Sequence, residues 1–312
     1  MSKKSFRILL VLCLLIGTVF LFIGGPSNDM ARSFKHLWNI GHIGYFYILS
    51  YMLANTDLLK KRTRVVQWIL LLGFSLLLGT LIEVLQYGTT REPDIGDIVR
   101  DVTGSFLYLA FCNRLMKWST IWPLYVVKVS AVILLLVQLA PLMDALRDEA
   151  IARAQFPVLS SFETPLELDR WEGSAARKIV ILSEILSTSV MQVDLTTDRY
   201  SGVGLKYFPA DFRGYQNLKL LIYQSDEQAL KVTLRLHDRE HELGPNGYAS
   251  NDRFRKSFML QQGWNELSID LNAVRLAPKR REMNMAEIAD VSLFVSHQKR
   301  PWTIYLDDVL LE

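Results

Sequence analysis

Long apolar blocks dominate the first half of the chain, whereas apolar and polar residues alternate in the second half. Five apolar segments lie at about residues 7–25, 37–54, 65–87, 97–113 and 121–143. A helix needs roughly 20 residues to cross the hydrocarbon core of a bilayer. The first, third and fifth segments meet this length, and the other two are shorter and more polar. The pattern predicts an α-helical membrane bundle of five transmembrane helices over residues 1–143.

Basic residues flank the apolar segments in a pattern that sets their direction. They precede the first segment, separate the second from the third, and separate the fourth from the fifth, at Lys3, Lys4, Arg7, Lys60, Lys61, Arg62, Arg64, Arg114 and Lys117. Such residues mark cytoplasmic loops, and these groups share one side only if all five segments cross. We therefore expect a cytoplasmic (inner) membrane protein with its N-terminus in the cytoplasm and an extracytoplasmic C-terminal domain. A cleaved signal peptide over the first segment is the alternative, and it would leave that domain on the same side.

The second half of the chain has the alternation of half-buried strands. Leu230, Val232, Leu234 and Leu236 alternate with polar residues. Further strands are expected near 178–182, 190–195, 202–208, 218–224, 267–271, 291–296 and 303–310, with one helical turn near 284–289. Many short strands at this spacing favour an all-β jelly-roll sandwich over residues 158–312. Residues 144–157 are expected to form a charged helical extension or linker.

Composition excludes several classes of function. The net charge is only +3 and no Lys/Arg-rich run occurs, which argues against nucleic acid as a partner. Both cysteines, Cys13 and Cys112, lie in predicted membrane segments, so no disulfide framework holds the second half. The chain has no nucleophile elbow, no Cys/His metal spacing and no phosphate-binding glycine loop.

Polar residues cluster in residues 79–104, between the third and fourth apolar segments. Glu83 and Gln86 are expected on one helix face, because three residues make nearly one turn. Asp94, Asp97 and Asp101 are expected on one stripe of the next helix, with Asp94 and Asp97 near its N-terminus. Gly104 lies on the same stripe and suits close helix approach, as do Gly41 and Gly44 of the second segment. Arg100 is expected to point away from the stripe.

The cluster has a structural and a functional interpretation. In the structural one, Glu83 pairs with Arg91, the aspartates cap a helix, and His42 bonds to a neighbouring backbone group. In the functional one, three neighbouring carboxylates raise one another's pKa or recruit a metal or a proton. Charge beside hydrocarbon is costly and therefore often functional.

The same residues resemble a known family. The spacing Glu83-x2-Gln86-x4-Arg91-x2-Asp94-x2-Asp97-x3-Asp101-x2-Gly104 and the upstream His42-x3-Phe46 resemble the signature of VanZ-like membrane proteins over about residues 40–115. Two positions depart from it: Trp38-Asn39 stands where the family commonly has Asp-Lys, and Asp101 where it commonly has Asn. The resemblance implies a bacterial cell-envelope protein, with glycopeptide antibiotic tolerance in some members. It names no reaction.

The second half resembles jelly-roll modules of the galactose-binding, carbohydrate-binding type. The resemblance rests on Phe162-Glu163-Thr164, on Gly214-Tyr-Gln-Asn-Leu-Lys-Leu220 and on the ending Ile304–Glu312. It implies a structural Ca²⁺ between Glu163 and either Asp307 or Asp308, which should project from opposite strand faces. Candidate sugar contacts are Tyr200, Tyr223, His237, Asp238, Arg239 and Trp302. Trp171, Trp264 and Phe294 are expected in the core.

Two functions from different classes follow. The first is binding: the sandwich engages envelope glycan, and Gln86, Asp94, Asp97 and Asp101 help bind membrane lipid or a lipid-linked precursor. The alternative is an integral-membrane enzyme acting on a lipid-linked glycan or phospholipid headgroup. In that case His42 or Glu83 is the acid/base, Arg91 holds a phosphate or carboxylate, and the aspartates hold a divalent metal. An ion-coupled transporter is a third possibility.

Overall fold

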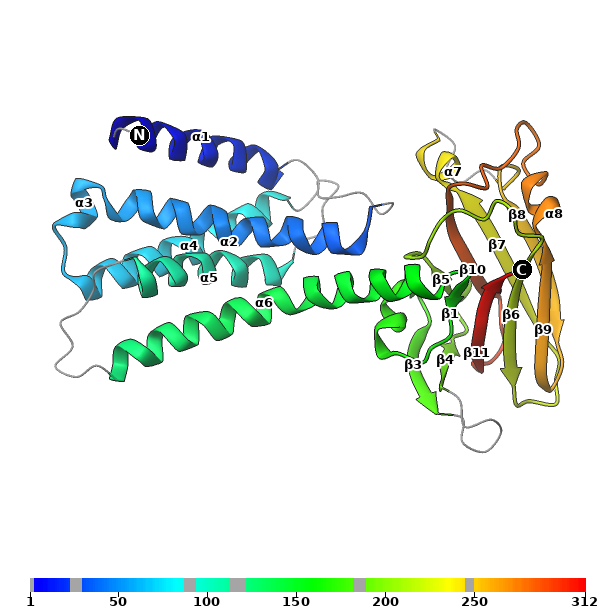
Figure 1. The fold of residues 1–312 in the computed structure, drawn as a ribbon. Helices are drawn as coiled ribbons and strands as arrows, with labels where there is room; N and C mark the ends of the chain where they lie inside the picture. Colours follow the sequence, from blue (N-terminus) through cyan, green and yellow to red (C-terminus); the bar gives the residue numbers. More distant parts are fainter. Residues whose placement is uncertain (1–2, 23–29, 87–93, 113–121, 182–188, 245–249) are drawn as a thin grey trace. The chain divides into compact units, whose positions relative to one another are not determined.

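The chain folds into two compact units, Met1–Ala145 and Leu146–Glu312. The computed structural model describes residues 3–22, 30–86, 94–112, 122–181, 189–244 and 250–312. The first unit is helical and the second is built mainly of strands (Figure 1). One helix, α6 (Trp122–Gln155), has residues in both units. It includes most of 144–157, so this segment is a helical extension.

Three of the described helices are long and apolar enough to cross a membrane: α1 (Lys3–Phe22), counted from Lys4, α4 (Arg64–Gln86) and α6. Between them lie α2 (Arg32–Ala54), the short α3 (Asp57–Lys60) and α5 (Ile95–Phe111). The 17 residues of α5 span about 26 Å at 1.5 Å per residue, less than the ~30 Å hydrocarbon core. The crossing of all five segments therefore stays a prediction.

Helices α2 and α5 pack closely because Gly104 has no side chain. A Cβ atom at Gly104 would lie 2.3 Å from the carbonyl oxygen of Ile43, so only glycine permits this approach. The prediction for Gly104 is confirmed. The prediction for Gly41 and Gly44 is wrong, because no atom lies within 4 Å of their Cβ positions. Both are exposed, whereas Ile43 and Phe46 form the packed face of α2.

The outward faces of α1, α4 and α6 are apolar. Large side chains such as Leu15, Ile69, Leu77, Val126 and Val137 are more than half exposed. Soluble proteins rarely expose so much contiguous apolar surface. These helices therefore have the surface expected of segments in contact with lipid.

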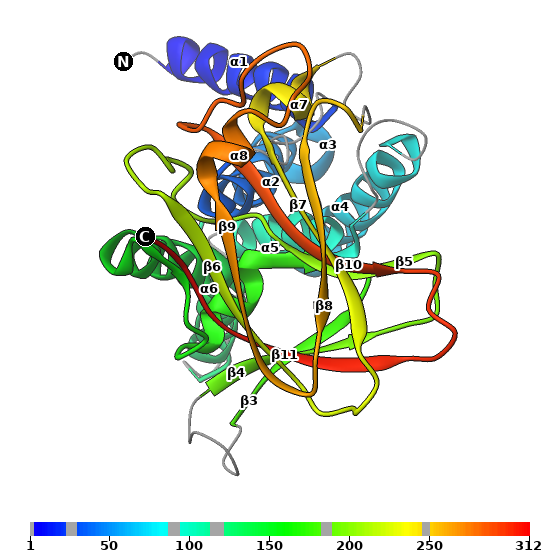
Figure 2. The ribbon, with the colours of Figure 1, turned by 90° about the vertical axis from the view of Figure 1, so that its right-hand side faces the viewer.

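The second unit is a sandwich of two antiparallel sheets (Figure 2). Sheet A has the order β3 (Ala176–Ile181), β4 (Ser189–Leu195), β11 (Trp302–Leu311), β6 (Asn217–Gln224), β9 (Gly263–Asp270), and β1 (Val158–Ser160) also pairs with β11. Sheet B has the order β2 (Trp171–Gly173), β5 (Tyr200–Leu205), β10 (Ile288–Ser296), β7 (Leu230–Asp238), β8 (Phe254–Leu260). The predicted all-β sandwich is therefore present.

Eight of these strands overlap segments predicted from alternation, whereas β1, β2 and β8 were not predicted. The unit also contains three short helices, η1 (Pro165–Arg170), α7 (Arg239–Leu243) and α8 (Leu271–Arg275). A turn is present where a helical turn was predicted near 284–289, but it ends at residue 287. The chain there forms a single turn, closed by a 3.0 Å hydrogen bond from Glu287 N to Asn284 O, before β10 begins at Ile288.

The core of the sandwich lies between the inner faces of the two sheets. In β6, Leu218, Leu220 and Ile222 are buried, and the residues between them are not. Trp171 is fully buried, as predicted. Trp264 and Phe294 were also predicted in the core, and this is wrong. Each sits at an outward position of its strand, because adjacent side chains point to opposite faces.

A buried ion pair ties the end of α6 to the start of the sandwich. Arg170 is fully buried, and its Nε donates to Asp148 Oδ1 at 2.9 Å and Oδ2 at 3.1 Å. Its Nη1 donates to the carbonyl oxygen of Leu159 in β1 at 2.8 Å. Asp148 belongs to α6 and is itself 2 % exposed. The pair thus joins α6, η1 and β1.

Replacement of Asp148 by Asn should strongly destabilise this unit. It removes the carboxylate that meets the buried guanidinium at 2.8–3.1 Å and leaves the longer 3.7 Å contact with Glu167 Oε2. We expect this to cost roughly 3–5 kcal/mol of unfolding free energy. Denaturant unfolding followed by tryptophan fluorescence measures the change. Asp211→Asn is the matched control, because Asp211 pairs with Arg213 on the surface. Equal unfolding midpoints for the two variants would contradict the assigned role of the buried pair.

Candidate functional site

In the helical unit, His42 lies between two carboxylates of α5. His42 Nδ1 is 2.8 Å from Asp101 Oδ1, and His42 Nε2 is 3.4 Å from Asp97 Oδ2. All three side chains are at most 2 % exposed. The two aspartates are four residues apart and share one helix face. The close approach of α2 and α5 at Gly104 therefore brings the imidazole and both carboxylates together.

Gly79 of α4 leaves room for this cluster. A Cβ atom at Gly79 would lie 2.5 Å from Asp101 Oδ2. The cluster of His42, Asp97 and Asp101 thus includes a side chain of α2, and Asp101 packs against Gly79 of α4.

The N-terminus of α5 has a second set of polar contacts. Asp94 caps the helix by accepting a 2.7 Å hydrogen bond from Gly96 N, and its own backbone N donates to Glu83 Oε2 at 2.8 Å. Arg100 Nη1 donates to Asp94 Oδ2 at 3.1 Å and also to Asp97. The expectation that Arg100 points away from the stripe is wrong, because residues three apart on a helix lie on neighbouring positions of one face.

Gln86 and Arg91 were also predicted in the membrane site. Gln86 Nε2 donates to the carbonyl oxygen of Leu21 at 2.7 Å and so holds the ends of α4 and α1 together. Arg91 lies outside the described residues. The structure thus brings His42, Asp97 and Asp101 into one group. Glu83 is linked to Asp97 through the backbone of Asp94 and the side chains of Asp94 and Arg100.

An apolar cavity of about 370 Å³ opens beside His42 between α1 and α2. Its wall is formed by His42 and by Gly17, Phe20, Leu21, Phe34, Leu37, Trp38, Gly41 and Tyr45. Gly41, which was expected to pack against another helix, instead helps keep this cavity open. The lining is mainly apolar, with the His42 imidazole and the Tyr45 phenol as its titratable side chains.

In the sandwich, a larger cleft of about 530 Å³ lies on the outer face of sheet B. Strand register places Gly204, Ser292, Arg235 and Arg255 side by side across β5, β10, β7 and β8. A Cβ atom at Gly204 would come within 2.7 Å of Asp290 Oδ1. At Gly202 it would come within 2.3 Å of the backbone of β10. No side chain fits at either position, so β5 forms an open floor.

Two aromatic side chains line this cleft. Tyr200 and Phe294 meet edge to face with ring centroids 6.0 Å apart, and Tyr200 is half exposed. Tyr200 was among the candidate sugar contacts. Of the others, Trp302 is buried and Tyr223 contacts Trp264 on the outer face of sheet A.

A fully buried carboxylate, Asp290, lies beneath the cationic part of the cleft. Its oxygens are 3.2 Å from Lys206 Nζ, 3.0 Å from Arg235 Nη2 and 3.7 Å from His237 Nδ1, and it accepts from Ser292 Oγ. Burial alone would raise the pKa of Asp290. The nearby charges of Lys206, His237 and Arg235, with the Ser292 hydrogen bond, instead hold that pKa below its ordinary value. The carboxylate therefore fixes the position of Arg235.

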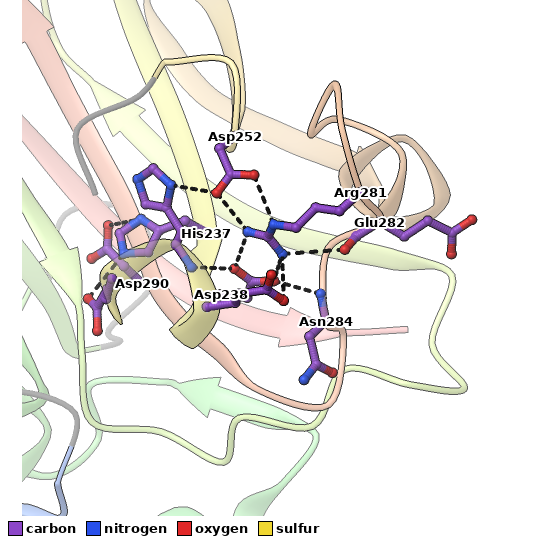
Figure 3. Close-up of polar contacts among 10 residues, drawn as sticks. His237, Asp238, Asp252, Arg281, Glu282, Asn284 and Asp290 are labelled. Carbon is purple, nitrogen blue, oxygen red and sulfur yellow. Dashed lines mark hydrogen bonds and ion pairs between the residues drawn. The ribbon is translucent and has the colours of Figure 1, made fainter. Parts of the chain in front are cut away.

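A second charged network lies next to Asp290 (Figure 3). The Arg281 guanidinium lies between Asp238 and Asp252, with contacts of 2.5–2.8 Å to each carboxylate. Hydrogen bonds from Arg281 lower the pKa of Asp252. They also hold the pKa of Asp238 low although burial opposes this. The network joins the loop before β10 to the end of β7, and it engages the carboxylate of Asp252.

Of the predicted calcium residues, Asp307 and Asp308 lie in β11, and Glu163 lies between β1 and η1. Asp307 is 5 % exposed, whereas Asp308 is exposed and has a φ of 41°. Burial, followed by the charges of Asp308, Glu163 and Glu167, raises the pKa of Asp307 to about 6. Such a cluster of acids has the oxygen chemistry that Ca²⁺ prefers. Within the described ranges, however, no three His, Cys, Asp or Glu side chains lie close enough together to hold a metal ion. Calcium stays a prediction.

No family model matches the sequence, and no curated protein matches it. Solved structures similar to the second unit include the family 11 carbohydrate-binding module of Clostridium thermocellum, with 16% identity over 49% of this chain and 93% of that one, at a TM-score of 0.38. The CBM22-2 xylan-binding domain of Paenibacillus barcinonensis Xyn10C is 12% identical over 46% and 90%, with a TM-score of 0.32. An exo-beta-agarase is 14% identical over 50% and 24%, with a TM-score of 0.40. Because these identities and TM-scores are low, the neighbours do not indicate what this chain binds. The ligand has to be inferred from the cleft itself.

Sequence reasoning missed most of the cleft. Lys206, Arg235, Arg253 and Arg255 line it, and none was a candidate. The available signal was the alternation of Arg235 with Leu234 and Leu236, which places this arginine on the outer face of a strand. Its proximity to Arg255 depends on the pairing of β7 with β8, which the local pattern does not contain.

The raised pKa of Asp307 predicts a specific pH dependence. A carboxyl group whose pKa is raised in the folded state destabilises the fold once it is ionised. The free energy of unfolding therefore falls as pH rises from 3.8, the ordinary pKa of the group, to about 6. Asp307→Asn should therefore unfold at a higher temperature than the wild type above about pH 6, and the advantage should vanish below about pH 4. Thermal unfolding across this range measures the difference.

Glu227→Gln is the control for this titration, because Glu227 is exposed and is not among the groups that shift the pKa of Asp307. If calcium binds at Asp307, its addition should raise the unfolding temperature of the wild type and not that of Asp307→Asn. A constant difference between wild type and Asp307→Asn at every pH would contradict the assigned titration.

Proposed function

We propose that this chain is a glycan-binding protein of a bacterial cell envelope, anchored in the cytoplasmic membrane by its apolar helices. The cleft on sheet B carries the proposal. It has the size of a ligand site, an open glycine floor, two aromatic rings and several fixed polar groups. A sugar ring has apolar C–H faces and hydroxyl edges. Tyr200 and Phe294 suit the faces, and Ser292 and Arg235 suit the hydroxyl groups.

The distribution of basic residues supports an extracytoplasmic position for the sandwich. Lys60, Lys61, Arg62 and Arg64 lie between two apolar helices and favour the cytoplasmic side. With five crossings, the C-terminal unit then lies outside, where envelope glycans are found.

The helical unit suits an amphiphilic partner, and we propose a VanZ-like role for it. The apolar cavity would receive a lipid chain, and His42 with its two aspartates would meet the polar end. A lipid-linked glycan precursor combines these two chemistries. Glycopeptide antibiotic tolerance would follow from such a role.

Glycan binding should depend on Tyr200. Full-length protein in detergent micelles should bind members of a broad glycan array. Tyr200→Ala should weaken binding about tenfold, the effect of losing ~1.4 kcal/mol. Tyr223→Ala on the opposite sheet is the matched control and should bind like the wild type. Absence of any bound glycan, or equal losses in the two variants, would exclude the cleft as the site.

A second candidate function is an integral-membrane enzyme, and the buried His42 favours it. An imidazole held by Asp101 at 2.8 Å has a fixed ring orientation, as a general acid or base requires. The cavity would bring a lipid-linked glycan or a phospholipid headgroup to it.

The enzyme hypothesis predicts conversion of such a lipid by purified full-length protein, detected by mass spectrometry. His42→Gln should slow it at least about 100-fold, within the range for loss of an acid/base group. His36→Gln, on the same helix, is the control. Equal rates for wild type and His42→Gln would remove His42 from the reaction.

A further inference from the structure

Positive charge exceeds negative charge in the sheet-B cleft. The cleft is lined by four cationic side chains, Lys206, Arg235, Arg253 and Arg255. It is also lined by two acidic side chains, Glu172 and Asp290. Four positive minus two negative charges leave a formal excess of two. A glycan site for neutral sugars has no need of this excess.

The two acids are already engaged. Asp290 contacts Lys206 at 3.2 Å and Arg235 at 3.0 Å. Glu172 accepts a 2.9 Å hydrogen bond from the hydroxyl of Tyr207. Within the ranges that the structure describes, neither Arg253 nor Arg255 forms an ion pair. The excess charge therefore belongs to these two arginines.

The nearest carboxylate in the sequence is also engaged elsewhere. Asp252 precedes Arg253, yet it contacts Arg281 at 2.8 Å and His241 at 3.1 Å. Asp252 is thus engaged by Arg281 and not by its neighbour Arg253.

The arginines also lie in a mutually repulsive arrangement. Register places Arg235 directly opposite Arg255, and like charges at such positions destabilise a sheet. Burial and the charges of Arg235 and Arg255 lower the pKa of Arg253. The Arg255 guanidinium lies 5.6 Å from the centroid of the Phe294 ring, which holds it at the aromatic wall. An anion between these groups would relieve the repulsion.

We propose that the cleft binds an acidic glycan, whose carboxylate or phosphate group is received by Arg253 and Arg255 while its sugar ring meets Tyr200 and Phe294. The inference rests on the proposed glycan binding and adds the class of sugar. Guanidinium groups bind carboxylate and phosphate through paired charge-assisted hydrogen bonds, which suits either anion. A neutral glycan would leave the repulsion between the arginines in place, so it should bind more weakly.

The test compares matched glycans on full-length protein in detergent micelles. One arm uses oligogalacturonate and its methyl ester, which share a backbone and differ in carboxylate charge. The other uses phosphorylated mannan oligosaccharide and unmodified mannan. At least one acidic member should bind about tenfold or more tightly than its neutral partner, equivalent to ~1.4 kcal/mol. Which pair shows the difference identifies carboxylate or phosphate as the anion.

Two charge-removing variants and a control assign the effect to the cleft. Arg253→Gln and Arg255→Gln should each reduce the preference for the acidic glycan about tenfold, the effect of losing ~1.4 kcal/mol. They should leave binding of the neutral glycan unchanged. Lys178→Gln removes one exposed charge from sheet A and should retain the full preference. Circular dichroism of each variant verifies folding.

The outcomes separate this inference from the proposed function. Equal binding of acidic and neutral partners, unaffected by the arginine variants, overturns the inference and leaves glycan binding intact. A preference lost equally in Lys178→Gln shows attraction by overall charge and also overturns it. Binding of no glycan in either arm or on the broad array overturns both.

Discussion

The ion pair between Asp148 and Arg170 is the contact on which the second unit depends. A guanidinium with no exposure to water is tolerated only when a carboxylate meets it. Asp148 comes from α6, and Arg170 also binds the backbone of β1. The long helix is therefore part of the sandwich's own polar interior. This explains why α6 continues through the charged residues after the apolar segment.

The same requirement is met differently at the two candidate sites. In the helical unit, an imidazole lies between two carboxylates, and an arginine neutralises one of them. In the cleft of sheet B, the buried acid is over-compensated by surrounding cations. Partial exposure allows this excess, because water screens charges that would be intolerable in the core. The buried ion pairs are thus balanced in charge, whereas the cleft keeps an excess of positive charge that a ligand can meet.

Local sequence patterns predicted most of the fold, because alternation in strands and apolar length in helices are properties of single segments. They failed where the strand is short or polar. In β8, the three consecutive polar residues Arg255, Lys256 and Ser257 interrupt the alternation that would indicate a strand. Aromatic residues misled in another way: Phe294 was assigned to the core by its hydrophobicity, although its strand position faces outward. The cleft depends on register between distant strands, which spacing alone does not encode. The contact of Arg100 with Asp97 was different, because the i,i+3 spacing allowed it and was not used.

The floor and the charges of the cleft come from different strands. Gly202 and Gly204 of β5 shape the floor, whereas Arg235 and Arg255 of β7 and β8 supply charge. Substitution of Arg235 or Arg255 would therefore alter the charge that a ligand meets, whereas a side chain at Gly202 or Gly204 would obstruct the floor of the groove. Ligand preference in such a sandwich is free to diverge through β7 and β8, while β5, on the other side of the central strand β10, stays constrained.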